Sequence, residues 1–343
     1  MVNDQPKFEP DPRYRPGDES PPPIRIAVSG AGGHVGYGLA FQLASGALFG
    51  FQQSLTLSLL ETPAAMKRLQ AMRLELRDCA FPLLDDVLFS DDPHEAFADA
   101  DWIVMLAGQA AKIDAGSRLD LVRANGPIYV EHGRVINLVA PRAKMLVVAD
   151  PCNTNCRIAM KYAPNVPVQH WFALNRLDRM RATALIAEKA GVPVKRVNRV
   201  TVWGNHSGKI FPDFHNAFIG EQRADQVIND PDWSRRVLEP MISHREKELF
   251  ALHGASPSAT ATYAILGTIR SINTPTPVRR RFGAAVRSDG SYGVPQDLVF
   301  GFPLRSDGQH WSIVEGLYID EYAESRLNEN IEELEQEAVV AGV

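Results

Sequence analysis

A histidine, an aspartate and an arginine in the second half of the sequence are of the types that transfer protons and bind carboxylates. His206 follows the apolar segment 200–203, so we expect it to project from a loop at the end of a strand. A free imidazole has a pKa of about 6.5, which suits reversible proton transfer to and from an alcohol. Asp178 and Arg181 stand three residues apart in a predicted helix that ends at Gly191, and this spacing places both on one face. Taken alone, each also fits a structural role: a buried histidine, a capping aspartate or a surface arginine.

Three glycines near the N-terminus form a turn of the kind that holds a phosphate group. Gly30, Gly33 and Gly36 follow the apolar segment 24–28 and precede a helical pattern. The spacing is a variant of the dinucleotide-binding fingerprint, in which glycines let backbone N–H groups approach a pyrophosphate at a helix N-terminus. Glu61 ends the next predicted strand, where it would bind both ribose hydroxyls and repel a 2′-phosphate. The pattern predicts NAD rather than NADP, although Glu61 also fits a solvated residue at the start of a loop.

The elements that must position these residues alternate along the first half of the sequence. Short apolar runs typical of buried strands occur at residues 24–28, 55–60, 102–107 and 145–149, with helical patterns between them. Strands that alternate with helices predict an α/β fold with a doubly wound parallel sheet of the Rossmann type. We expect this NAD-binding domain to span residues 24–173.

Both ends of the sequence differ from this α/β region. Residues 1–23 contain seven prolines and few bulky aliphatic side chains, so we expect a disordered tail. Residues 174–343 are expected to form an α+β domain that binds the substrate and carries the catalytic residues. Within it, segment 321–340 combines apolar residues at helical spacing with many glutamates, which predicts an amphipathic C-terminal helix with a solvated acidic face.

The composition excludes several classes of protein. Of 343 residues, 45% are hydrophobic and 22% are charged, as in a globular protein rather than a disordered or collagen-like one. The net charge of −5 gives no basic excess for nucleic acid or an anionic membrane, and no apolar run is long enough to span a bilayer. Three cysteines are too few for a disulfide framework, so we expect a reducing, cytoplasmic setting. Cys152 and Cys156 have no histidine at metal-ligand spacing, so we expect no zinc site.

Seven stretches occur in one order along the sequence with few gaps. They read SGAGGHVGY, LELRDCAFPLL, PCNTNC, NRLDRMRA, VWGNHS, SYGVPQDL and IVEGL. Together they resemble the cytosolic-type malate dehydrogenases of the lactate/malate dehydrogenase superfamily, and LELRDCAFPLL and WGNHS are highly specific for that branch. The resemblance implies an enzyme that transfers a hydride between NAD and a small 2-hydroxy acid, with malate and oxaloacetate as the leading pair.

The resemblance also implies roles for single residues. His206 would be the acid/base that exchanges a proton with the substrate oxygen, and Asp178 would orient its imidazole. Arg181 would bind the C1 carboxylate of the substrate through its planar fork. Arg118, expected in a mobile loop after the strand at 102–107, would polarise the reacting carbonyl.

Further implications concern the cofactor and the assembly. Asn125 and Asn153 would join the glycine turn and Glu61 in binding NAD, with Asn153 beside the nicotinamide ribose. The implied assembly is a homodimer. We expect a small 2-hydroxy or 2-oxo acid as the ligand, and neither nucleic acid nor a membrane as a partner.

Two departures from the family pattern fall inside the predicted site. The family has an arginine pair in the mobile loop, whereas this sequence has Lys112 and Ile113. Lys112 would still neutralise a distal substrate carboxylate but lacks the planar fork. The family has an asparagine that donates to the substrate oxygen, whereas this sequence has Asp150, and an ionised carboxylate only accepts hydrogen bonds. At about 4 Å and an effective dielectric constant near 20, Asp150 would repel an oxyanion by about 4 kcal/mol.

Asp150 leaves the identity of the substrate open. It is compatible with a protonated carboxyl, with pairing to Lys112 or Arg118, or with a substrate that offers a hydroxyl or ammonium donor. Two alternatives to malate dehydrogenation therefore remain: a divergent dehydrogenase of another 2-hydroxy acid, and a non-catalytic NAD-binding protein. The complete catalytic set argues against the second, because a binding protein has no need of an acid/base pair.

Overall fold

A nine-stranded sheet runs through the molecule, with the strand order β14-β13-β12-β6-β5-β4-β1-β2-β3. The computed structural model describes residues 22–109, 117–254 and 257–343. The parallel strands are β1 (Ile24–Ser29), β2 (Leu55–Leu60), β3 (Leu84–Ser90), β4 (Trp102–Met105), β5 (Lys144–Val147) and β6 (Trp171–Ala173). Their order is that of a Rossmann-type doubly wound sheet, so the predicted fold class is confirmed.

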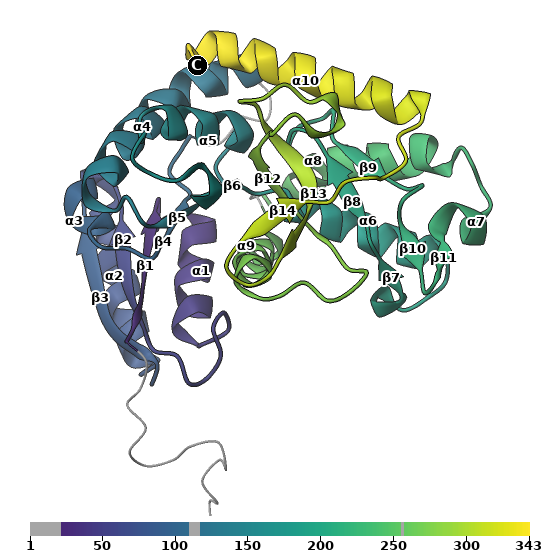
Figure 1. The fold of residues 1–343 in the computed structure, drawn as a ribbon. Helices are drawn as coiled ribbons and strands as arrows, with labels where there is room; N and C mark the ends of the chain where they lie inside the picture. Colours follow the sequence, from purple (N-terminus) through teal and green to yellow (C-terminus); the bar gives the residue numbers. More distant parts are fainter. Residues whose placement is uncertain (1–21, 110–116, 255–256) are drawn as a thin grey trace, which may run out of the picture.

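Helices cover both faces of the parallel strands (Figure 1). On one face lie α1 (His34–Ala44) and α2 (Met66–Asp78), and on the other lie α3 (Pro93–Phe97), α4 (Arg118–Val139) and α5 (Cys152–Lys161). Within β1, Ile26 and Val28 pack into the first hydrophobic core, whereas Ala27 packs into the second. Strands buried on both faces read as nearly continuous apolar runs, which is why the sequence revealed them.

The second half of the chain extends the same sheet and adds smaller ones. Strands β12 (Phe282–Arg287), β13 (Val299–Ser306) and β14 (Trp311–Ile313) are antiparallel, and β12 joins β6 through the pair Ala285 and Ala173. The short strands are β7 (Val197–Asn198), β8 (Thr201–Trp203), β9 (Phe211–Asp213), β10 (Phe218–Ile219) and β11 (Gln222–Arg223). The helices are α6 (Arg176–Lys189), α7 (Ala224–Ile228), α8 (Glu239–His253), α9 (Ser258–Asn273) and α10 (Glu321–Ala341). Single turns occur at Pro63–Ala65, Val168–His170, Val194–Arg196, Ser234–Leu238 and Ser291–Gly293.

Helix α10 lies across both halves of the chain. It packs against α4 and α5 at one end and against β9 nearer the other (Figure 1). The predicted helix over 321–340 is therefore present, and Glu321, Glu324, Glu332 and Glu335 are exposed as expected, but its inward face also carries polar residues. Glu337 and Asn330 are 0% exposed, because both point into the protein and have hydrogen-bonding partners there.

The carboxyl ends of β1, β2, β4 and β5 lie at one edge of the sheet, because these strands run parallel. The glycine turn, Glu61 and Asp150 follow β1, β2 and β5 at this edge. Ligands of open α/β sheets bind at this edge.

Some expectations concern residues near the ends or outside the described part. The first strand begins at Ile24 as expected. Residues 1–21 of the proposed tail lie outside the described residues. Arg118 was expected in a loop but is the first residue of α4, because Ser117 and Asp120 form a capping box there. In the described part of the chain, every helix is too short or too polar to cross a membrane.

Candidate active site

The glycine turn has a shape that only glycine permits. Gly30 has φ +70°, and a Cβ placed on it would lie 2.8 Å from the backbone nitrogen of Ala107. A Cβ on Gly36 would lie 2.6 Å from the carbonyl oxygen of Ala31. Gly33 is the N-cap of α1 and supplies no side-chain cap, so the N–H groups of the first helical turn are available to an anion. The turn therefore fits the pyrophosphate of a dinucleotide.

Glu61 lies directly beside this turn, as predicted from its place at the end of β2. Its Oε2 accepts a hydrogen bond from the backbone N–H of Gly32 at 3.0 Å, and its Oε1 accepts one from Thr62 at 2.9 Å. These bonds hold the carboxylate where the ribose of a dinucleotide would meet the end of the second strand.

The structure brings His206, Asp178 and Arg181 together. Nδ1 of His206 lies 2.5 Å from Oδ2 of Asp178, and Nη1 of Arg181 lies 3.2 Å from Oδ1 of the same carboxylate. All three side chains are largely buried, with 15%, 3% and 12% of their surface exposed. Nη2 of Arg181 is buried and has no hydrogen-bond partner among the described residues, so an anionic ligand would complete its bonding.

The carboxylate of Asp178 controls the charge of the histidine. Burial by itself lowers the pKa of His206, but the ion pair with Asp178, supported by Asp150, raises it to about 9. Burial would raise the pKa of Asp178, yet His206 and Arg181 hold it below its usual value. The imidazole is therefore protonated at neutral pH and has a proton ready on Nε2, opposite the bond to Asp178.

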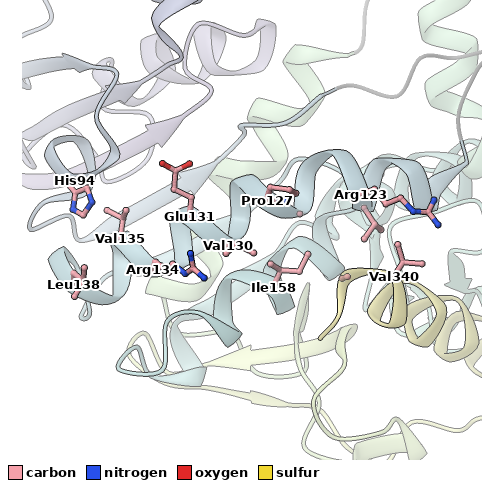
Figure 2. A pocket seen from close by; sticks show the side chains of 13 residues that line it. His94, Arg123, Pro127, Val130, Glu131, Arg134, Val135, Leu138, Ile158 and Val340 are labelled. Atoms are coloured by element: carbon pink, nitrogen blue, oxygen red, sulfur yellow. The ribbon is translucent and has the colours of Figure 1, made fainter.

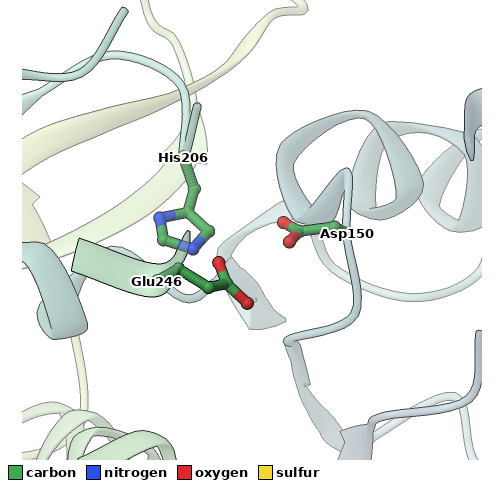
Figure 3. Close-up of side chains that lie close together, drawn as sticks. All are labelled: Asp150, His206 and Glu246. Atoms are coloured by element: carbon green, nitrogen blue, oxygen red, sulfur yellow. The ribbon is translucent and has the colours of Figure 1, made fainter. Parts of the chain in front are cut away.

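Two further carboxylates face the same imidazole. Asp150, Glu246 and His206 each have a polar atom within 4.8 Å of the other two, and Figure 3 shows both carboxylates turned toward the ring. Oδ1 of Asp150 is buried without a hydrogen-bond partner in the described part of the chain. Burial and then the charge of Asp150 raise the pKa of Glu246. Nothing in the sequence pointed to Glu246, because only the packing of α8 against α6 brings it here.

Arg118 reaches the site from the N-terminus of α4. Its Nε donates to the carboxylate of Glu337 on α10, and its Nη2 donates to Oδ1 of Asn205 at 3.1 Å. Asn205 directly precedes His206, so Arg118 is anchored to the loop that carries His206. Lys112 and Ile113 lie outside the described residues.

Asn125 and Asn153 are buried, and their amides are engaged within the protein. Asn125 accepts from the backbone N–H of Gln109 at 2.7 Å and donates to the carbonyl oxygen of Asp150 at 2.7 Å. Asn153 donates to the carbonyl oxygens of Val299 and Gly204 at 2.9 and 3.3 Å. In this structure both residues therefore brace the backbone around the site.

Sequence reasoning missed the residues of α10 that hold the His206 loop, residues 205–207. Asn330 accepts from the backbone N–H of Asn205 at 2.8 Å, and Glu333 accepts from the Ser207 hydroxyl at 2.5 Å. The two contacts bracket His206 on both sides. Asn330 and Glu333 stand three residues apart in the predicted helix, so the sequence places them on one face. Helical periodicity did not indicate that this face points into the protein.

A cavity of about 780 Å³ lies along α4, between that helix, α5 and the end of α10. Figure 2 shows its lining, which includes Arg123, Pro127, Arg134, Leu138 and Ile158. No residue of the predicted active site lines it. The chemistry of the side chains, rather than the volume of this cavity, locates the candidate active site.

Comparison with known proteins agrees with this arrangement. Residues 24–170 match the NAD-binding domain of lactate/malate dehydrogenases, and residues 175–340 match their alpha/beta C-terminal domain. Malate dehydrogenase from Magnetococcus marinus is 42% identical over 316 residues, which cover 92% of this chain and 96% of the relative.

Two solved structures resemble the whole fold. The crystal structure of malate dehydrogenase from Naegleria fowleri has a TM-score of 0.89 and 31% identity, covering 94% of this chain and 99% of its own. Lactate dehydrogenase from Trichomonas vaginalis, in complex with NADH and oxamate, has a TM-score of 0.89 and 32% identity, covering 93% of this chain and 98% of its own.

Proposed function

Because this chain belongs to the lactate/malate dehydrogenase family and is an NAD-dependent dehydrogenase, we propose that it interconverts a small 2-hydroxy acid and its 2-oxo acid. Malate and oxaloacetate are the leading pair, since the relative that is 42% identical is a malate dehydrogenase. The observation that carries the proposal is the hydrogen-bonded set of His206, Asp178 and Arg181. Within this set, Nη2 of Arg181 has no partner among the described residues.

Each of these side chains has a distinct task in this reaction. Arg181 binds the C1 carboxylate of the substrate through its unpaired nitrogen. The imidazolium of His206 donates its Nε2 proton to the ketone oxygen as C2 is reduced, and the neutral imidazole takes that proton back in the reverse direction. Asp178 keeps Nδ1 protonated throughout and so fixes the tautomer. When bound, NAD supplies the nicotinamide carbon that gives or accepts the hydride.

The charge of His206 at neutral pH favours binding of the 2-oxo acid over binding of the 2-hydroxy acid. With its pKa raised to about 9, the ring carries a proton at neutral pH, so it donates to the oxygen of a 2-oxo acid. A 2-hydroxy acid needs the neutral ring as an acceptor. We therefore expect the enzyme–NADH complex to bind 2-oxo acids readily at neutral pH, and the oxidation of 2-hydroxy acids to improve as the pH rises toward 9.

The test follows NADH consumption with a panel of 2-oxo acids, beginning with oxaloacetate. A purified His206→Asn variant is the control for contaminating enzymes. Reduction of oxaloacetate at about 1–1,000 s⁻¹ supports malate dehydrogenase activity. If the chain binds NADH but reduces no 2-oxo acid, the proposal fails and the non-catalytic alternative takes its place.

A second candidate function, dehydrogenation of a different 2-hydroxy acid, is favoured by Asp150 and Glu246. Both carboxylates face the place where the substrate oxygen meets His206, and neither can donate a hydrogen bond when ionised. A substrate with a hydroxyl or ammonium group beside C2 would satisfy them, whereas the second carboxylate of oxaloacetate would be repelled.

Substrate profiles separate the two candidates. If oxaloacetate is poor and a 2-oxo acid with a 3-hydroxyl or 3-ammonium group is better, Asp150→Asn and Glu246→Gln should each shift preference back toward oxaloacetate. Glu248→Gln, which changes an exposed glutamate of the same helix, is the matched control. An unchanged profile in both active-site variants would remove the second candidate.

We also propose the finer assignments that the family resemblance suggests. The division into an NAD-binding domain over 24–173 and a catalytic domain over 174–343 is supported by the family matches to 24–170 and 175–340. The homodimer is proposed from the family resemblance. A cytoplasmic location is supported by the cysteine content. Light scattering coupled to size-exclusion chromatography measures the oligomeric state.

A further inference from the structure

Glu337 is a buried carboxylate that receives hydrogen bonds from three separate elements. Arg118 of α4 donates to it through Nε, Thr154 of α5 donates through its hydroxyl, and Asn205 of the His206 loop donates through Nδ2 at 2.9 Å. Its side chain is 0% exposed. A carboxylate taken out of water to this degree is stable only when it is paired and hydrogen-bonded, which the three donors accomplish.

The contacts of Arg118 leave one nitrogen for a ligand. Glu337 holds Nε, and Asn205 holds Nη2 at 3.1 Å, so the plane of the guanidinium is fixed along one edge. Nη1 makes no hydrogen bond to any of the described residues, and the side chain is 23% exposed. Two anchored nitrogens define the direction of the third, because the guanidinium is planar and rigid.

The same face of α10 fixes the residues on both sides of His206. Asn205 is held through its backbone N–H by Asn330 and through its amide by Glu333 and Glu337. Ser207 is held through its hydroxyl by Glu333. Helix α10 thus positions both Arg118, which by the family resemblance polarises the substrate oxygen, and the loop of His206, which exchanges a proton with that oxygen. Glu337 contacts both Arg118 and this loop.

We infer that Glu337 is a positioning residue of the dehydrogenase, which sets the direction of Arg118 relative to the His206 loop through their shared carboxylate. This inference rests on the proposed function and on the role that the family resemblance implies for Arg118, which is to polarise the reacting oxygen. Glu337 itself touches no substrate. Its effect on the reaction therefore has to pass through Arg118, and that requirement separates positioning from general support of the fold.

The test is a double-substitution cycle with Glu337→Gln and Arg118→Gln. The amide introduced by Glu337→Gln can still accept from Arg118 and Asn205 and can donate to Thr154, so the variant removes the charge while keeping the shape. We expect Glu337→Gln to lower kcat for 2-oxo acid reduction about tenfold, with the KM for NADH unchanged. In the Arg118→Gln background the same change should cost less than about twofold, because the two act as a unit.

Controls and a second readout make each outcome decisive. Glu332→Gln, at an exposed position of α10, should leave kcat unchanged, and the melting temperature of every variant reports its folding. An equal loss of kcat in both backgrounds would make Glu337 merely structural. An increase in kcat would mean that Glu337 withholds Arg118 from the substrate. Either result, or no change at all, overturns the inference.

Oxalate binding distinguishes failure of this inference from failure of the proposed function. Oxalate is a small dianion shaped like the carboxylate and carbonyl of a 2-oxo acid, and NADH fluorescence reports its binding without turnover. We expect Glu337→Gln to weaken oxalate binding at least fivefold in the wild-type background and not in the Arg118→Gln background. If the wild type reduces no 2-oxo acid, the proposed function fails, and this binding cycle alone decides whether Glu337 acts through Arg118.

Discussion

Replacement of Asp178 by asparagine should move the pH dependence of the reaction, because Asp178 is the principal source of the raised pKa of His206. Asparagine has nearly the same shape and can still hydrogen-bond to Nδ1, but it carries no charge. Burial, the larger effect, and Arg181 then remain to lower the pKa of the imidazole, and only Asp150 still raises it. We expect the pKa of His206 to fall from about 9 toward its ordinary value of about 6.5.

The expected loss of activity follows from the size of the change in the pKa of His206. A change from about 9 to the ordinary value of about 6.5 corresponds to roughly 3 kcal/mol of preference for the imidazolium. At pH 7.5 the wild-type ring is almost fully protonated, whereas a ring with a pKa of about 6.5 is protonated in about one molecule in ten. Loss of the proton alone therefore predicts about a tenfold decrease in kcat/KM for 2-oxo acid reduction at that pH.

The assay is kcat/KM for reduction between about pH 5.5 and pH 10, where the alkaline limb reports the acid of the enzyme–NADH complex. The limb should lie near pH 9 in the wild type and move toward about pH 6.5 in Asp178→Asn. Asp225→Asn is a matched control, since Asp225 lies 3.0 Å from His215 away from the active site. An alkaline limb that stays near pH 9 in a folded, NADH-binding Asp178→Asn variant would refute the assignment of the limb to this pair.

Three other predictions concern single features of the structure. Gly30→Ala should weaken NADH binding at least tenfold or prevent folding, because the new Cβ would lie 2.8 Å from the Ala107 backbone and φ at this position is +70°. The control is Gly38→Ala, whose Cβ would have its closest contact at 3.4 Å and which should bind NADH normally in the same fluorescence titration. Arg181→Lys should raise the KM for the 2-oxo acid about a hundredfold while leaving the Kd for NADH unchanged, because lysine lacks the planar fork; equal losses for both ligands would contradict the assigned role. Thiol titration of the native protein should find one reactive cysteine, the exposed Cys79, and titration after denaturation should find three. Cys152 and Cys156 should not react in the native state because burial raises the pKa of their thiols. A second fast-reacting thiol in the native state would argue against their burial.

The parallel half of the fold could be predicted from the sequence because its signals are local. The strand at 55–60 was predicted with the bounds that β2 has, and the glycine turn was placed by the strand before it and the helix after it. The set of His206, Asp178 and Arg181 rested on helical spacing together with the family motifs. Strands β3 and β6 were missed, because LDDVLFS lacks a clear apolar run and WFA is only three residues long.

What the sequence did not reveal depends on tertiary contacts. Glu246 enters the site only because α8 packs against α6, and the inward face of α10 contains polar side chains that periodicity analysis assigns to solvent. One error could have been avoided locally. Ser117 and Asp120 stand at the spacing of a capping box, which signals that a helix begins at Arg118.

The single pair between Ala173 and Ala285 also determines how the protein can be divided. A fragment ending after β6 would keep all the strands of the Rossmann half, yet it would turn β6 into an edge strand. Trp171, Phe172 and Ala173 are almost completely buried in the intact chain, so this new edge would be apolar and would carry unpaired backbone N–H and C=O groups. Such edges pair with other copies of themselves. Expressed alone, the NAD-binding half should therefore aggregate unless a strand equivalent to β12 is supplied to cover it.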